Sequence, residues 1–217
     1  MGRADWLDRS SMDYVLAAMM PANRLVMECC IASGLRVSDV LSLKTDALAR
    51  GQRITVREQK TGKSRRIYWP SRLYTRMLEQ AGRVWVFEGR NNWRKHRTRS
   101  AVYKDLRRVA RVFRVSGIID KKVQISTHTG RKMWAVDEYR RTGDLQSFGR
   151  AQNHDGRHRE TTMLYAMADA ITAGKKGQKR AVSGENSITA RHIGTKQKSA
   201  PWGAFLFGAG RLKLWRP

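Results

Sequence analysis

The chain has few features of a membrane or secreted protein. None of its apolar runs approaches the roughly 20 residues that a membrane-spanning helix needs, and the segment Met1–Trp6 has no apolar signal-peptide core. Cysteine is almost absent. Cys29 and Cys30 are adjacent in an apolar, helix-like stretch, where the backbone keeps them out of disulfide geometry. We therefore expect two reduced packing residues in a cytoplasmic protein and no thiolate metal site.

Acidic residues are also scarce. The 18 Asp and Glu residues stand against 44 Lys and Arg residues, which gives a formal net charge of +26. Surface solvation alone does not require a surplus of this size. It predicts a polyanionic partner, and it favours nucleic acid over an anionic membrane or a small-molecule substrate.

The chain has no internal repeat, and its 217 residues suit one substantial domain with a tail. Apolar periodicity indicates a globular domain over residues 1–171. Residues 172–217 are rich in Gly, Ser, Thr and basic side chains, with Glu185 as their only acidic residue. Because this composition buries little apolar surface, we expect a flexible basic tail.

Local signals predict a mainly helical α+β domain. Pro21 suits the start of a helix that Gly34 ends, and a second short helix begins near Ser38. Residues 53–57 and 64–69 alternate with strand period around a turn at 60–63, which predicts an antiparallel hairpin. Further helices are expected at about 71–81, 98–115, 128–142, 144–152 and 160–170.

Four residues suggest anion binding, but each is ambiguous alone. A chain that turns at Gly34 can project Arg36 beside helix-terminal amides, although such an arginine is more often salt-bridged or solvated. Lys60, at an exposed hairpin tip, could reach a nucleic-acid groove or be an ordinary turn lysine. His128 and Arg131 share one helix face.

Two other patterns are rejected. Lys63-Ser64 is not part of a P-loop, because Arg57 stands where that motif needs glycine and the context is strand–turn–strand. His154 and His158 have helical i,i+4 spacing, but the turn-like pair 155–156 separates them and no third ligand is evident. We therefore expect no metal site.

Taken together, these residues resemble the catalytic domain of the tyrosine recombinase (phage integrase) family. The matching motifs are Ser33-Gly34-Leu35-Arg36-Val37-Ser38-Asp39, Lys60-Thr61-Gly62-Lys63, Thr127-His128-Thr129-Gly130-Arg131-Lys132, Gly143-Asp144-Leu145 with Asn153-His154, and Thr161-Thr162-Met163-Leu164-Tyr165-Ala166. They cover about residues 12 to 169. The resemblance implies the tyrosine-recombinase catalytic-domain fold, with one small antiparallel sheet.

The resemblance also implies a mechanism. A free tyrosine hydroxyl has a pKa of about 10 and is a poor nucleophile, so its attack on a phosphodiester needs surrounding cations. The implied roles are nucleophile for Tyr165, phosphate grip for Arg36 and Arg131, proton transfer at the tyrosine for His128, donation to a phosphate oxygen for His154, and protonation of the leaving 5′ oxygen for Lys60. A 3′-phosphotyrosyl intermediate results, and neither a metal nor a cofactor is required.

The implied partner is duplex DNA, bound by a homo-oligomer that reaches a tetramer because recombination joins four strands. Localisation would be cytoplasmic and nucleoid-associated, in a bacterial or phage-infected cell. Expected DNA-backbone contacts are Lys63, Lys132, Lys175, Lys176, Lys179 and Arg180. Lys132 points away from the His128–Arg131 face, and the apolar stretch Trp202–Trp215 is a candidate for packing on a neighbouring protomer.

The chain departs from the family pattern at three points. Only 35 residues precede Arg36, so we expect the N-terminal DNA-clamping domain to be absent. His154 and Tyr165 are 11 residues apart, more than is usual, and His158 stays open as a substitute. Gly130 replaces an apolar residue inside a helix, at a cost of about 1 kcal/mol relative to Ala.

Three alternatives to a recombinase follow from the same residues. A catalytically impaired, integrase-derived DNA-binding or regulatory protein would have the same charge and helices. A type IB topoisomerase-like relaxing enzyme would share the nucleophile and the cations. A basic RNA- or ribosome-associated protein would explain the charge but not the ordered residues.

Overall fold

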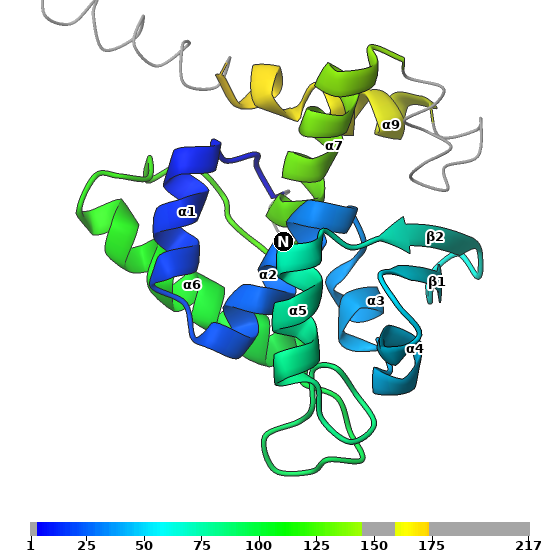
Figure 1. Cartoon of the computed structure of the whole chain (residues 1–217). Helices are drawn as coiled ribbons and strands as arrows, with labels where there is room; N and C mark the ends of the chain where they lie inside the picture. The colour runs from blue at the N-terminus through cyan, green and yellow to red at the C-terminus, as the bar shows by residue number, and fades with distance from the viewer. Residues whose placement is uncertain (1–3, 145–158, 174–217) are drawn as a thin grey trace, which may run out of the picture. The chain divides into compact units, whose positions relative to one another are not determined.

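The computed structural model describes residues 4–144 and 159–173 and is mainly helical, with one two-stranded antiparallel sheet (Figure 1). Its elements are α1 (Arg9–Ala17), α2 (Pro21–Ser33), α3 (Val37–Leu41), α4 (Thr45–Ala49), β1 (Arg53–Arg57), β2 (Ser64–Tyr68), α5 (Ser71–Gln80), α6 (Arg99–Val115), α7 (His128–Thr142) and α9 (Arg159–Ala166). After α9 the chain is helical again over 168–173. The predicted α+β class is confirmed.

The predicted helix boundaries agree closely with the observed ones where local capping sets them. Gly34 has a φ of 65° and its amide donates to Cys30 O at 2.9 Å, so it ends α2 in the left-handed conformation. Thr98 caps α6 by accepting from the Ala101 amide at 3.1 Å. The predicted helix at 144–152 lies outside the described residues, apart from its first position.

Two helices were not predicted. For α1 the signal was present: the Asp8 carboxylate accepts from the Ser11 amide at 2.9 Å, as an N-cap does. The five-residue α4 has too few turns for a 3.6-residue period to be readable.

The hairpin has the predicted form, and its register fixes which side chains face inward. Arg53 pairs with Tyr68, and Val56 pairs with Arg65. Both strands alternate between exposed and buried positions, so Ile67 and Arg65 are buried on the same face of β2. An arginine therefore occupies a core-facing position beside the turn.

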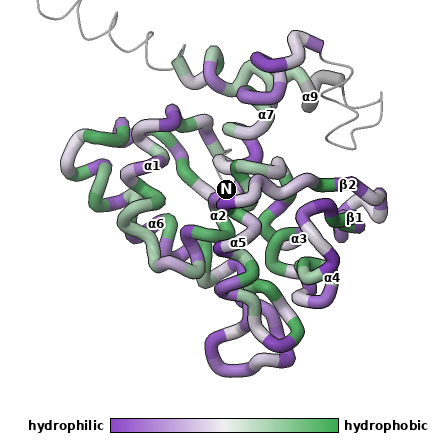
Figure 2. The backbone as a smooth tube through the Cα atoms, viewed as in Figure 1, coloured by the Kyte–Doolittle hydropathy of each residue, from purple (hydrophilic) through white to green (hydrophobic). Residues whose placement is uncertain are grey.

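The core is built around α2, which contacts α1, α3, α5, α6 and α7. Cys29 and Cys30 are buried and free, which confirms the packing role predicted for them. Gly130 lets α7 approach closely, because a Cβ there would lie 3.2 Å from Cys30 Cβ. This close approach is the physical reason for a glycine inside a helix. Hydrophilic residues dominate the long connection between α5 and α6 (Figure 2).

In the described part of the chain, none of the helices has both the length and the apolarity needed to cross a bilayer.

Candidate active site

Arg36 lies at the N-cap position of α3, directly after the turn at Gly34. Its side chain is only 16% exposed, and its guanidinium is paired with the Glu58 carboxylate. The Asp39 carboxylate, on the same short helix, is 4.0 Å from Arg36 Nη1. The arginine is therefore held by carboxylates while one part of it stays accessible.

Arg131, in the first turn of α7, is docked on the Arg36 turn. It is 2% exposed, and its Nη1 donates to the carbonyl of Gly34 at 2.5 Å. Burial lowers the pKa of Arg131 to about 10, and the positive charge of Arg36 contributes to the shift. The guanidinium is still charged at neutral pH, in a place that favours a bound anion.

His128 begins α7 and is half-buried. Burial lowers the pKa of His128 below its ordinary value, and four cations lower it further: Arg99, Arg131, Arg36 and Lys60. The imidazole is therefore mostly neutral at pH 7 and can accept a proton. Because Lys60 is one of these cations, the hairpin turn that carries it lies within electrostatic reach of His128.

Tyr165 lies on α9, which packs against α7. Its ring is partly buried beside Ala135 and Ala166, and the Lys132 ammonium is 5.9 Å from the ring centroid. Tyr165 also interacts electrostatically with Arg131. The structure thus brings Tyr165 to the same end of α7 that presents Arg131.

An ion pair between Arg140 on α7 and Asp169 further stabilises the packing of the C-terminal helical segment. Thr172 is buried in this segment, where its hydroxyl accepts from the Trp6 amide at 3.4 Å and donates to Ala168 O at 2.7 Å. The segment is therefore tied to the N-terminal part of the domain.

The remaining predicted site residues have different placements. Lys63 is exposed on the hairpin turn. The prediction of Lys132 as a DNA-backbone contact on the surface is wrong. Its side chain is buried, and its ammonium donates to the Ala4 carbonyl. It lies under Tyr165 and anchors the N-terminal segment. The other predicted residues lie outside the described residues: His154, His158, Lys175, Lys176, Lys179, Arg180 and the stretch Trp202–Trp215.

Sequence reasoning missed three buried residues of this site: Asp39, Glu58 and Arg65. Asp39 and Glu58 have fully buried carboxylates, and Arg65 is 9% exposed. A signal for Arg65 existed, since strand alternation puts it in phase with Ile67. The two carboxylates had no such signal, because acidic residues after a short helix start and before a turn are commonly solvated.

Arg65 is held between several groups. Its Nη2 donates to Ser33 O at 2.7 Å, and its guanidinium carbon is 5.2 Å from the centroid of the Trp134 ring. Trp134 in turn covers Gly34, where an added Cβ would lie 2.3 Å from the ring. Three arginines (Arg36, Arg65 and Arg131) and two carboxylates (Asp39 and Glu58) thus meet around one turn, and the net charge of the group is positive.

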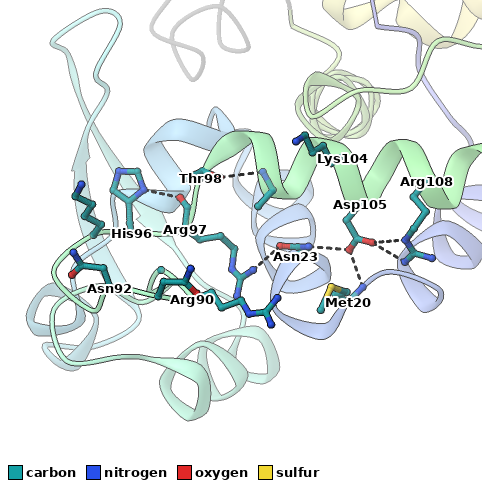
Figure 3. A pocket seen from close by; sticks show the side chains of 14 residues that line it. Met20, Asn23, Arg90, Asn92, His96, Arg97, Thr98, Lys104, Asp105 and Arg108 are labelled. Carbon is teal, nitrogen blue, oxygen red and sulfur yellow. Dashed lines mark hydrogen bonds and ion pairs between the residues drawn. The ribbon is translucent and has the colours of Figure 1, made fainter.

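A second cationic hollow of about 560 Å³ lies between α6 and the α5–α6 connection (Figure 3). Its basic lining residues are Arg90, Lys95, Arg97, Lys104 and Arg108. Asp105 also lines it, but its carboxylate already accepts from the Met20 amide and from Asn23 Nδ2, each at 2.9 Å. The hollow therefore presents excess positive charge.

Among residues 4–144 and 159–173, no group of three or more His, Cys, Asp or Glu side chains is arranged to hold a metal ion.

Several solved structures share this fold. A lambda integrase dimer bound to a COC′ core site has a TM-score of 0.63 and 16% identity, covering 76% of this chain and 60% of that one. The XerH recombinase bound to its difH substrate has a TM-score of 0.57 and 18% identity, with 74% and 50% covered. The catalytic domain of bacteriophage HP1 integrase has a TM-score of 0.52 and 19% identity, with 76% and 89% covered.

The chain thus spans about half to three-fifths of the lambda and XerH structures and matches most of the isolated HP1 catalytic domain. No curated protein sequence matches it significantly. The sequence model of the phage integrase family matches residues 5–170, well over half of the chain. The ordered motifs, the helical fold with its single hairpin, and this match agree: the chain belongs to the phage integrase family of tyrosine recombinases.

Proposed function

We propose that this protein cuts and rejoins duplex DNA through a covalent 3′-phosphotyrosyl intermediate on Tyr165. One observation carries the proposal. Arg131 donates to the Gly34 carbonyl at the Arg36 turn and interacts electrostatically with Tyr165. A scissile phosphate bound between the two arginines would therefore be within electrostatic reach of the tyrosine.

The chemistry follows from this arrangement. The Tyr165 oxygen attacks phosphorus and its proton passes to neutral His128, while the bond between phosphorus and the 5′ oxygen breaks. Arg36 and Arg131 stabilise the charge that develops on the non-bridging oxygens. Lys60 supplies the proton that the leaving 5′ oxygen takes up. Rejoining is the reverse, with the 5′ hydroxyl as nucleophile, so no external energy source is needed.

His154 is assigned to a phosphate oxygen on its family motif alone, and His158 is the substitute. His154→Ala and His158→Ala should slow adduct formation to different extents, and the variant with the larger loss identifies the histidine that contacts the phosphate.

The proposed partner is duplex DNA, bound by several copies of the chain. The lambda structure is a dimer on a core site, and the XerH structure holds its difH substrate. A full strand exchange uses four tyrosines, so we propose a tetramer as the active assembly. The cationic hollow beside α6 would add backbone contacts. The protein would act in the cytoplasm, at the nucleoid.

A nicked suicide duplex tests the proposal, because the short cleaved strand diffuses away and traps the adduct. Wild type should accumulate a DNA-linked protein whose modified peptide contains Tyr165. Tyr165→Phe should bind the same duplex and form no adduct. Adduct formation by the Phe variant would show that the nucleophile is another residue.

Two further assays separate the alternatives. Wild type that binds the duplex but forms no adduct would be an impaired, regulatory member of the family. Wild type that relaxes supercoiled plasmid without recombining two sites would be a topoisomerase-like enzyme.

A further inference from the structure

Glu58 is a buried carboxylate at the junction of β1 and the hairpin turn. Its side chain is fully buried, and its Oε2 accepts from Arg36 Nη1. Oε2 also accepts from the Thr61 hydroxyl at 3.2 Å, and Oε1 is 3.6 Å from Arg65 Nη1. One carboxylate therefore contacts a phosphate-binding arginine and the turn that carries Lys60.

The two residues that flank Lys60 are each tied to a buried acid. Thr61 donates its hydroxyl to Glu58, and the Gln59 amide donates to Asp39 Oδ1 at 3.0 Å. Asp39 is on α3, the helix that Arg36 caps. The backbone of the turn adds two bonds, from Gly62 N to Glu58 O at 2.8 Å and from Glu58 N to Lys63 O at 2.9 Å.

Glu58 stays ionised in this setting. Burial alone would raise the pKa of Glu58, but the hydrogen bond from Arg36 and the charges of Arg131 and Arg65 lower it below its ordinary value. A buried charge of this kind persists only when its partners hold it in place. Glu58 in turn holds these partners in place.

We infer that Glu58 is a positioning residue, which couples the grip of Arg36 on the scissile phosphate to the placement of Lys60 at the leaving oxygen. This inference rests on the proposed function. Moving either group by about 1 Å is enough to slow a reaction on the order of 100-fold. A purely structural Glu58 would instead neutralise Arg36 and Arg65 without affecting Lys60.

A change of leaving group distinguishes these roles. Single-turnover adduct formation is measured on two suicide duplexes, one with the ordinary phosphodiester and one with a bridging 5′-sulfur, a leaving group that needs no proton. Glu58→Gln should slow the ordinary substrate by about 100-fold. With the sulfur linkage, the loss of rate caused by Glu58→Gln should be smaller by about tenfold or more. The loss of rate caused by Lys60→Ala should become smaller in the same way.

Two milder variants carry the test even if the Gln variant folds poorly, which thermal melting reveals. Thr61→Val removes, on an exposed turn, the hydroxyl bond to Glu58 and the longer bond of 3.4 Å that this hydroxyl accepts from the Lys63 amide. It should give a smaller loss, which the sulfur linkage relieves in the same way. Glu58→Asp keeps the negative charge, and its rate of adduct formation should lie between those of wild type and Glu58→Gln. Glu138→Gln removes the carboxylate paired with Arg141 on α7 and should leave both rates unchanged.

The outcomes are distinct. Equal losses on the two linkages for Glu58→Gln and Thr61→Val, with wild type active, would overturn the positioning role and leave the proposed function intact. Wild type that forms no adduct on either linkage would overturn the proposed function, and the inference with it.

Discussion

Arg131 donates a hydrogen bond of 2.5 Å to the carbonyl of Gly34, a residue 97 positions earlier in the chain. This bond joins the start of α7 to the turn that presents Arg36. Since Trp134 packs on the same glycine, the turn is fixed by a hydrogen bond and by an aromatic ring. The geometry of the two arginines therefore depends on the absence of a side chain at Gly34.

Gly34→Ala should destabilise the protein for two reasons. The left-handed conformation costs a non-glycine residue about 1–2 kcal/mol, and the new Cβ would lie 2.3 Å from the Trp134 ring. Displacing the ring adds about 1–3 kcal/mol. Urea unfolding measures the sum. Gly117→Ala is the matched control, because Gly117 has a φ of 78° and nothing within 4 Å of an added Cβ. Equal losses at both positions would refute the clash.

The pH dependence of cleavage should report His128. Its pKa is lowered by burial and by neighbouring cations, so the neutral base persists below the ordinary value of about 6.5. Single-turnover adduct formation should therefore decline in acid with a midpoint below about pH 6.5. His128→Ala should be slower and lose that decline. A wild-type midpoint above pH 7 would contradict a lowered pKa.

Asp105 should contribute to stability above pH 4 and lose that contribution in acid. Burial raises its pKa, but hydrogen bonds from Asn23, Arg108 and the Met20 amide more than offset this, so the pKa is lowered in the folded state. The stabilisation is present above the unfolded value of about 3.9 and is lost as the pH falls through the folded value.

Asp105→Ala should therefore reduce the free energy of unfolding at pH 7 by about 2–3 kcal/mol, because buried donors lose a charged acceptor. The difference from wild type should narrow below pH 4. Asp46→Ala, which removes an exposed ion pair with Arg50 at 3.8 Å, should cost less than about 1 kcal/mol. If Asp105→Ala reduces the free energy of unfolding by the same amount at every pH, the effect is due to packing and not to the carboxylate charge.

Removal of residues 174–217 should reduce the salt dependence of DNA binding. The cut follows residue 173 because Thr172 is buried and contacts Trp6. The deleted segment has ten basic residues and one acidic residue, so the net charge falls by 9, from +26 to +17. Each lost phosphate contact lowers the slope of log K against log salt by about 0.9.

Fluorescence anisotropy over a salt series measures this slope. Alanine at Lys175, Lys176, Lys179 and Arg180 in the full chain should give part of the same change. An unchanged slope in the truncated protein would place the tail off the DNA.

Much of the architecture was set by local sequence signals. Pro21 and Gly34 bound α2, and the period-two pattern around Lys60 specifies the hairpin, because caps, turns and strand alternation act over a few residues. The order of the motifs also predicted the side chains of the candidate site. The structure places Arg36, Lys60, His128, Arg131 and Tyr165 within electrostatic reach of one another or of a common neighbour.

Only the tertiary structure decided which charged residues are buried. Lys132 resembles a surface lysine in sequence, yet it lies under Tyr165. Glu58 resembles a solvated turn residue, yet it bridges Arg36 and the Lys60 turn. Burial of a charge depends on partners brought from distant segments, and residue spacing along the chain contains no record of those contacts.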